Sequence, residues 1–177
     1  GYTNAGKSST INSILNYVES DFDKQVFVKD MLFATLETST RRIKLLNNHE
    51  FLITDTVGFV NKLPHHLVES FKSTLEEIKD SSLIVHVVDA SSPYMDQQIK
   101  TTREVLQELD VLDIPNIFVF NKVDIIKEPR FITSIYPDAL LISSKTMQGY
   151  DELIETIDTL LFPKEYHVVY KLPYNLG

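Results

Sequence analysis

The chain has 177 residues, a length typical of a single domain, and 43% of them are hydrophobic, which is enough to build a core. Its net charge of −8 argues against a general electrostatic clamp on nucleic acid, so any RNA contact is expected to need other parts of the protein. The absence of cysteine excludes disulfides and thiolate metal sites, and the longest apolar run, "SLIVHVV", is too short to span a bilayer.

The opening stretch, "GYTNAGKSST", has the spacing of a phosphate-binding loop, with four residues between Gly1 and Gly6-Lys7-Ser8. Glycines let the backbone curl so that N–H groups point at phosphate oxygens, and the next helix adds its positive dipole end. Lys7 supplies a mobile charge for the β- and γ-phosphates, and the Ser8 hydroxyl can ligate magnesium. The alternative is an ordinary glycine turn before a helix. The residues predicted to bind phosphate here are Gly1, Asn4, Ala5, Gly6, Lys7, Ser8 and Ser9.

Helical periodicity follows this loop and predicts a helix over residues 7–18. The apolar residues at helical spacing are Ile11, Ile14, Leu15 and Val18. A phosphate-binding loop is normally held at the carboxyl end of a buried parallel strand, and the given sequence starts at the loop. We therefore expect that first strand to be truncated from this chain and to lie upstream in a longer protein. Without it, the chain is expected to fold poorly.

The next stretch, "ESDFDKQVFVKDMLFATLETSTRR", has little periodicity and predicts a long irregular connection, a kind of segment that is usually functional. A threonine in this loop could ligate magnesium only while a γ-phosphate is present, and its release would make a switch. Thr35 is the predicted ligand, with Thr38 and Thr40 as alternatives. Arg41 and Arg42 are expected at a solvated strand edge rather than at the phosphates.

Short apolar runs predict the strands. "RRIKLL" and "EFLITDT" flank Asn47-Asn48, whose tolerance of left-handed backbone suits a tight hairpin. "SLIVHVVD", "NIFVFNK" and "ALLIS" have the pattern of strands buried on both faces. The predicted helices between and after the runs cover residues 63–78, 96–109, 128–134 and 151–161. This alternation indicates a three-layer α/β fold with a mostly parallel sheet, whose ligands bind beyond the carboxyl ends of the strands.

The motif "DTVGF" ends the second of these runs. Asp55 is placed to hold magnesium through a water molecule, and the Gly58 N–H can approach a γ-phosphate because no side chain intervenes. A strand running into a β-turn would explain a lone Asp and Gly equally well, but not their order after a phosphate-binding loop. Phe59 stands where Ras-like enzymes carry the glutamine that orients the attacking water, so no catalytic side-chain base is expected and intrinsic hydrolysis should be slow. An apolar plug is the alternative role for Phe59.

The motif "NKVD" ends a later run and predicts guanine recognition. Asp124 can accept from the ring N–H and the exocyclic amine of guanine together, a donor pair that adenine does not present. Asn121 can tie this loop to the base and to the phosphate-binding loop, while the Lys122 stem packs over the ring. The weaker motif "SSK" would supply backbone donors for the guanine carbonyl oxygen from Ser143, Ser144 and Lys145.

Two adjacent histidines suggest a metal-binding or catalytic pair, but their spacing disfavours it. His65 and His66 are adjacent, and neighbouring helical positions do not face the same ligand, so we expect them at a helix start that moves with the switch. His86 lies inside an apolar strand and is expected to be a satisfied core residue.

Taken together, "GYTNAGKSS", "LFATLETSTR", "DTVGFVNKLPHHLVESFKSTLEEI" and "HVVDAS" resemble the HflX family of ribosome-associated GTPases, from Gly1 to about Leu161. The resemblance implies a P-loop NTPase G domain over residues 1–162, with residues 163–177 beginning a C-terminal segment. It further implies a cytoplasmic, GTP-hydrolysing switch that uses Mg²⁺ and acts on the large ribosomal subunit, in ribosome splitting or rescue under stress. Most ribosome contacts are expected through domains absent here, and the default expectation is a monomer without a membrane span.

Asn4 adds one expectation from related enzymes. In several GTPases with an asparagine at this place, its amide oxygen helps to hold a potassium ion, and we expect the same of Asn4. The alternative is a loop asparagine bonded to its own backbone. Two other functions stay open: another Obg-like GTPase, as in the tRNA-modifying and iron-transport groups, and a nucleotide-dependent interaction module with negligible turnover, which Phe59 favours.

Overall fold

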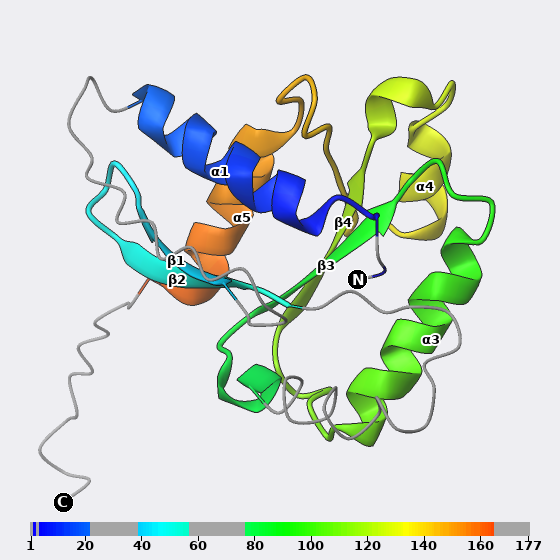
Figure 1. Ribbon diagram of the computed structural model, residues 1–177, viewed down its shortest axis with the longest axis horizontal. Helices are drawn as coiled ribbons and strands as arrows, with labels where there is room; N and C mark the ends of the chain where they lie inside the picture. The colour runs from blue at the N-terminus through cyan, green and yellow to red at the C-terminus, as the bar shows by residue number, and fades with distance from the viewer. Residues whose placement is uncertain (1, 3, 22–38, 57–76, 165–177) are drawn as a thin grey trace, which may run out of the picture.

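The computed structural model describes residues 2, 4–21, 39–56 and 77–164 (Figure 1). Within these ranges lie a two-stranded antiparallel hairpin, a three-stranded parallel sheet and the helices that cover them. The predicted helix over residues 63–78 falls almost wholly outside the described residues, and its last positions belong to a short 3₁₀ helix, η1 (Glu77–Asp80). None of the described helices is long and apolar enough to cross a membrane.

Helix α1 (Lys7–Asp21) starts directly after the phosphate-binding loop and runs beyond the predicted end at Val18. The Thr10 N–H donates to the Gly6 carbonyl oxygen at 2.7 Å, so the first helical turn is closed by the loop itself. In front of the loop, Tyr2 forms an isolated bridge and is buried against apolar residues at the end of the helix that follows the first parallel strand. The expected strand upstream of this loop stays a prediction.

The hairpin joins β1 (Ser39–Lys44) to β2 (Glu50–Asp55), with Ser39 opposite Asp55 and Lys44 opposite Glu50. Asn48 has a φ of 66°, in the left-handed region that the Asn47-Asn48 pair predicted, and its N–H donates to the Leu45 carbonyl oxygen at 3.0 Å. The expected turn chemistry is therefore confirmed at Asn48.

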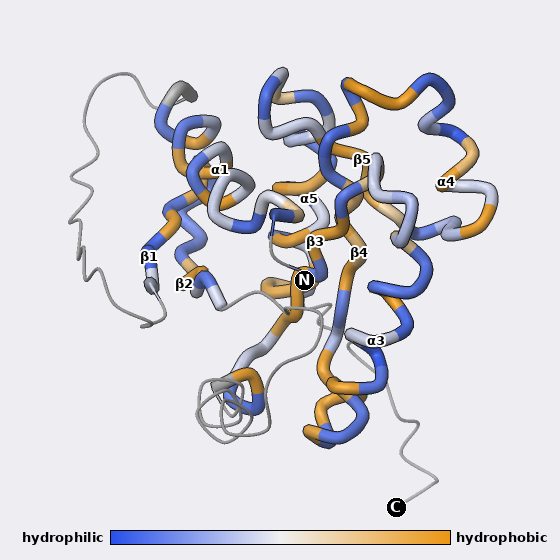
Figure 2. Tube along the Cα trace, turned by 45° about the vertical axis from the view of Figure 1, so that its right-hand side comes forward, coloured by the Kyte–Doolittle hydropathy of each residue, from blue (hydrophilic) through white to orange (hydrophobic). Residues whose placement is uncertain are grey.

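The parallel sheet has the order β3 (Ile84–Asp89), β4 (Asn116–Asn121) and β5 (Leu140–Leu141). Strand β5 is shorter than the predicted run, because the chain turns away after Ile142, whose N–H still donates to the Phe120 carbonyl oxygen at 2.9 Å. Figure 2 shows hydrophobic stretches along β3 and β4, as expected for strands covered on both faces.

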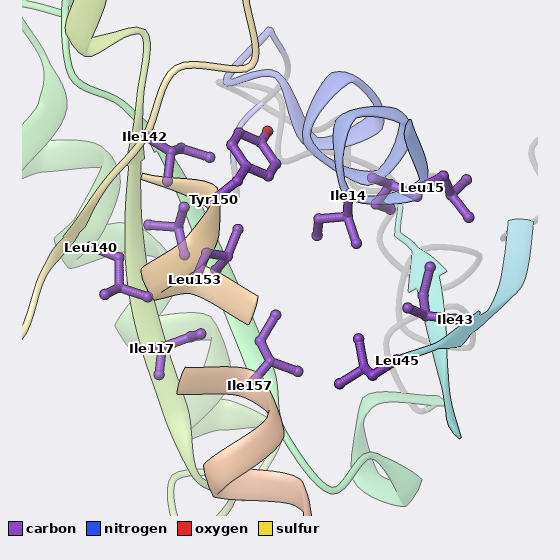
Figure 3. Packing of buried hydrophobic residues seen from close by; sticks show 12 residues of the cluster. Ile14, Leu15, Ile43, Leu45, Ile117, Leu140, Ile142, Tyr150, Leu153 and Ile157 are labelled. Atoms are coloured by element: carbon purple, nitrogen blue, oxygen red, sulfur yellow. The ribbon is translucent and has the colours of Figure 1, made fainter. Parts of the chain in front are cut away.

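Helices cover the two faces of this sheet. Ile117 and Val119 of β4 pack with α1, the hairpin and α5 (Tyr150–Leu161), in the core drawn in Figure 3. Phe120 points the other way, toward α3 (Met95–Glu108) and α4 (Arg130–Ile135). The short 3₁₀ helix η2 (Val123–Ile125) follows β4. The three-layer α/β arrangement with a parallel sheet is thus confirmed.

His86 corrects a detail of the sequence analysis. The side chain on β3 is buried, as expected, and its ring lies 4.8 Å from that of Phe118. It is not a satisfied core residue, however, because Nδ1 has no hydrogen-bond partner in the described part of the chain. Burial lowers the pKa of His86 from 6.5 to about 3, so the ring is neutral in the folded protein.

Acid should destabilise the protein through His86. The unfolded chain takes up a proton near pH 6.5 and the folded chain only near pH 3, so this contribution is complete above pH 6.5 and is lost progressively below it. Between pH 7 and pH 5 the loss is at most about 2 kcal/mol. Urea unfolding of His86→Leu should show a correspondingly weaker pH dependence. Phe118→Leu, a packing control, should keep the wild-type dependence; equal dependence in His86→Leu and wild type would contradict this account.

Candidate functional site

The candidate site lies where the carboxyl ends of the parallel strands meet the start of α1. The register pairs Asp89 with Asn121, so β3 and β4 end at the same level. The phosphate-binding loop stands against this edge, because Asn121 reaches the Ala5 carbonyl oxygen across 116 positions of sequence. The structure therefore brings together residues from three separate sequence motifs.

Asn121 is the centre of this arrangement, with only 2% of its surface exposed. Its Nδ2 donates to the Ala5 carbonyl oxygen at 3.2 Å. Its Oδ1 accepts from the N–H of Lys122 at 2.8 Å and from the N–H and Oγ of Ser144 at 3.0 and 3.2 Å. One buried amide thus joins the phosphate-binding loop, the "NKVD" loop and the "SSK" loop.

Gly6 allows this close approach. Its φ of 90° lies in the left-handed region, and an added Cβ would stand 2.3 Å from Asn121 Nδ2. Asn4, also left-handed at φ 66°, offers its carbonyl oxygen to Lys122 Nζ at 2.9 Å. The backbone of the phosphate-binding loop therefore curls on itself and also packs against the "NKVD" loop.

Lys7 lies across the loop, and its Nζ donates to the Tyr2 carbonyl oxygen at 3.1 Å. Burial lowers the pKa of Lys7, and the negative charge of Asp55 opposes part of that change. A half-buried ammonium group with a backbone acceptor is suited to exchange that acceptor for a phosphate oxygen.

Ser8 and Asp55 are brought into contact from α1 and the end of β2, and the Ser8 hydroxyl donates to Asp55 Oδ2. These are hard oxygen donors of the kind that Mg²⁺ prefers. The described residues hold no cluster of three or more His, Asp or Glu side chains that could bind a metal by themselves. The pair thus fits an ion that takes one or two protein oxygens and completes its shell with phosphate and water.

Asp124 stands at the start of η2 with an exposed side chain. The Ser143 hydroxyl donates to Asp124 Oδ1 at 2.7 Å and accepts from the N–H groups of Lys145 and Thr146 at 3.2 and 3.1 Å. The "SSK" loop therefore orients the carboxylate that the sequence predicts to read guanine.

Some residues at this site were missed by the sequence analysis. Thr10 and Ser13, on the buried side of α1, contact Ser144: the Thr10 and Ser144 hydroxyls lie 3.3 Å apart, and Ser13 Oγ donates to the Ser144 carbonyl oxygen at 3.1 Å. Asp89 accepts from Lys122 Nζ at 2.5 Å. The sequence signal for Thr10 and Ser13 was a pair of polar residues three positions apart, beside the apolar stripe of the helix. Asp89 was noted only as part of the motif "HVVDAS".

Other predicted residues are not at this centre or lie beyond the described ranges. Thr40 sits in β1, where its hydroxyl lies 2.9 Å from that of Thr54. Arg41 donates to Asn12 Oδ1 at 3.1 Å, and the exposed Arg42 lies 3.7 Å from Glu50. The predicted residues outside the described part of the chain are Gly1, Thr35, Thr38, Gly58, Phe59, His65 and His66.

Comparison with known proteins places these features in a family context. Residues 1–122 match the family model described as "50S ribosome-binding GTPase". The chain is 46% identical over 162 residues to GTPase HflX of Lacrimispora saccharolytica and 36% identical over 181 residues to GTPase HflX of Escherichia coli. The alignments cover 91% and 100% of the chain but 37% and 41% of the relatives, so the chain spans about two fifths of their length.

Solved structures agree on the fold. A GTP-binding protein from Sulfolobus solfataricus in complex with GDP superposes with a TM-score of 0.71 at 23% identity, over 90% of this chain and 50% of that one. Era in complex with MgGDPNP and nucleotides of 16S ribosomal RNA gives a TM-score of 0.61 at 23% identity, over 97% of this chain and 57% of that one. The predicted P-loop NTPase fold is thereby confirmed.

Replacement of Gly6 by alanine should break the link between loops, because the new Cβ displaces the Asn121 amide. The expected loss is about 2 kcal/mol or more, from backbone strain and an unsatisfied buried amide. Chemical unfolding would measure it, with Gln107→Ala on an exposed face of α3 as the control. Asn121→Ala should cost less in the Gly6→Ala background than in wild type, and fully additive losses would contradict the proposed clash.

Proposed function

Because this chain belongs to the 50S ribosome-binding GTPase family and matches its HflX members, we propose that it is the GTP-binding and GTP-hydrolysing part of a ribosome-associated switch. The observation that carries this proposal is the junction at Asn121, where the phosphate-binding loop and both predicted guanine loops share one buried amide. An accidental glycine turn would not be tied to two distant loops in this way.

Guanine selection is assigned to the "NKVD" and "SSK" loops. Asp124 accepts the ring N–H and exocyclic amine of guanine, and the bond from Ser143 sets its orientation. Lys122 covers the ring with its stem, while Ser144 and Lys145 offer backbone donors to the guanine carbonyl oxygen. A buried or oriented polar group that is matched by guanine and left unpaired by adenine gives strong discrimination.

The phosphates are assigned to the loop and the start of α1. Lys7 exchanges its bond to the Tyr2 carbonyl oxygen for bonds to the β- and γ-phosphates. The other residues assigned to the phosphates are Gly1, Asn4, Ala5, Gly6, Ser8, Ser9 and Gly58. Ser8, Thr35 and Asp55 would hold Mg²⁺, Asp55 through water. When bound, this ion neutralises charge that develops between the β- and γ-phosphates.

Hydrolysis on this assignment depends on positioning and charge neutralisation, with water as the nucleophile and no covalent intermediate. Phe59 cannot orient that water, so the intrinsic rate is slow and the ribosome supplies what is missing. A potassium ion at Asn4 would add positive charge beside the phosphates. The exposed Asn4 side chain and its left-handed backbone are compatible with such a contact.

The large ribosomal subunit is the proposed partner, in line with the description of the matching family, and splitting or rescue of ribosomes under stress is the proposed task. The acidic charge of −8 is unsuited to RNA binding by this part alone, so other regions of the protein make most of the contacts. Residues 1–162 form the GTP-binding domain and residues 163–177 begin a C-terminal segment. The proposed location is the cytoplasm, where ribosomes work.

One observation favours a second function. With Phe59 in place of a water-orienting glutamine, the domain could bind GTP and only change shape, as an interaction module that does not turn over. Phosphate release separates the two functions.

Asp124→Asn should weaken GTP binding by about 100-fold or more, since the exposed carboxylate is the acceptor for two guanine donors. The same change should shift preference toward xanthosine triphosphate, whose base presents an acceptor where guanine has its amine. Competition between fluorescent nucleotide analogues measures both effects, with Asp113→Asn, an exposed change of equal charge, as control. Unchanged GTP affinity would remove the base-reading role.

Large ribosomal subunits should accelerate phosphate release from GTP by the complete protein by about 10-fold or more. Release is measured with and without purified subunits, in potassium and in sodium buffers. Tight GTP binding without stimulation would support the interaction module instead. Equal rates in the two buffers would remove potassium from Asn4 and leave the rest of the proposal intact.

A further inference from the structure

Asp89 is a half-buried acidic side chain at the edge of the site, and nothing in the proposed function uses it. It ends β3 at the level of Asn121, and its side chain is 18% exposed. Its Oδ1 accepts from the N–H and hydroxyl of Ser91 at 2.9 and 2.6 Å, which closes the turn after the strand. Its Oδ2 accepts from Lys122 Nζ at 2.5 Å. The two oxygens therefore have different roles: Oδ1 stabilises the turn, and Oδ2 binds the Lys122 ammonium group.

Lys122 is held at both of its ends. Its backbone has a φ of 67°, and its N–H donates to Asn121 Oδ1 at 2.8 Å. At the far end of the side chain, Nζ bonds to Asp89 and also to the Asn4 carbonyl oxygen at 2.9 Å. The four-carbon stem is therefore held at both ends, between the "NKVD" loop and the phosphate-binding loop.

The Asp89 carboxylate stays ionised in its partly buried position. Burial by itself raises the pKa of its carboxyl, but the bonds from Lys122 and Ser91 and the charge of Lys122 outweigh it, so the net pKa lies below the ordinary value. Asp89 is thus ionised throughout the neutral range. The contact is a charge-assisted hydrogen bond in a partly water-excluded position, where such bonds are stronger than at a free surface.

Fixing a lysine side chain in advance matters for binding. A free lysine side chain loses rotamer entropy when a ligand immobilises it. A side chain that is already held by its neighbours has lost that freedom before the ligand arrives, so the ligand binds more tightly. The Asn4 carbonyl oxygen alone offers a neutral acceptor, whereas Asp89 offers a charged one.

We propose that Asp89 is a positioning residue for guanine-nucleotide binding, and that it holds the Lys122 side chain in place between the "NKVD" loop and the phosphate-binding loop. The inference rests on the proposed function, because the stem of Lys122 has a base to cover only if guanine binds there. It adds the end of β3 to the site, although no motif in the chain assigns a ligand contact to that strand.

The test is the rate at which the complete protein releases a fluorescent GDP analogue. Asp89→Asn keeps an acceptor for Ser91 but removes the charge that holds Lys122, and release should be about 10-fold faster. Ser91→Ala loosens the turn and leaves the ion pair, so its release should stay within about twofold of wild type. Asp113→Asn, an exposed change of equal charge, should behave like wild type.

A double-mutant cycle with Lys122→Met separates positioning from a structural effect. Asp89→Asn should change release by no more than about twofold in the Lys122→Met background, because there is no ammonium group left to hold. An equal acceleration in both backgrounds would overturn the inference. Unchanged release in Asp89→Asn alone would overturn it too, with GDP binding by wild type still supporting the proposed function.

Two further measurements complete the experiment. If wild type does not bind the GDP analogue, both the proposed function and this inference are wrong. Thermal unfolding without nucleotide shows whether each variant is folded. If Asp89→Asn is not, Asp89→Ser takes its place in the cycle, since it also removes the charge that holds Lys122 and keeps a polar group for the turn. Faster release that depends on Lys122 then supports the positioning role, and wild-type release contradicts it.

Discussion

The rest of the site depends on the side-chain amide of Asn121. An amide buried to 2% exposure has to find partners, since leaving one polar group unsatisfied costs about 1 to 3 kcal/mol. Here every partner belongs to a different loop or to the loop's own turn: Ala5, Ser144 and Lys122. The loops therefore cannot move independently without breaking a buried hydrogen bond. The arrangement also requires glycine at position 6, because a side chain at Gly6 would occupy the space of the Asn121 amide.

The position of Asn121 follows from how the sheet is covered. Consecutive residues of β4 face opposite layers, so Val119 is anchored against α1 and α5 and Phe120 against α3 and α4. Both side chains are fully buried, and the strand has no freedom to shift its register. The end of β4 is consequently rigid, and Asn121, which follows Val119 and Phe120, is held beside the start of α1.

The charges of the site run against those of the whole chain. The protein carries a net charge of −8, yet two ammonium groups point at the phosphate-binding loop, those of Lys7 and Lys122. Each is held by protein acceptors, Lys7 by a backbone carbonyl oxygen and Lys122 by Asp89 as well. Burial lowers the pKa of Lys7, and a bound phosphate would act in the opposite direction by stabilising the charged ammonium form. These two contacts support the proposed binding of nucleotide phosphates, which the net charge of the chain does not reveal.

The sequence by itself determined what depends on local spacing. The phosphate-binding loop before α1, the left-handed turn at Asn48 and the alternation of apolar runs with helical stripes all follow from backbone geometry within about ten residues. It also led to the family, which the comparisons bear out. Only the tertiary structure decided that β5 is short, that His86 lacks a partner for Nδ1, and that Asp89 holds Lys122. These features depend on which strands end at the same edge of the sheet and on which helices pack over them. Contacts between segments that are distant in the sequence determine both.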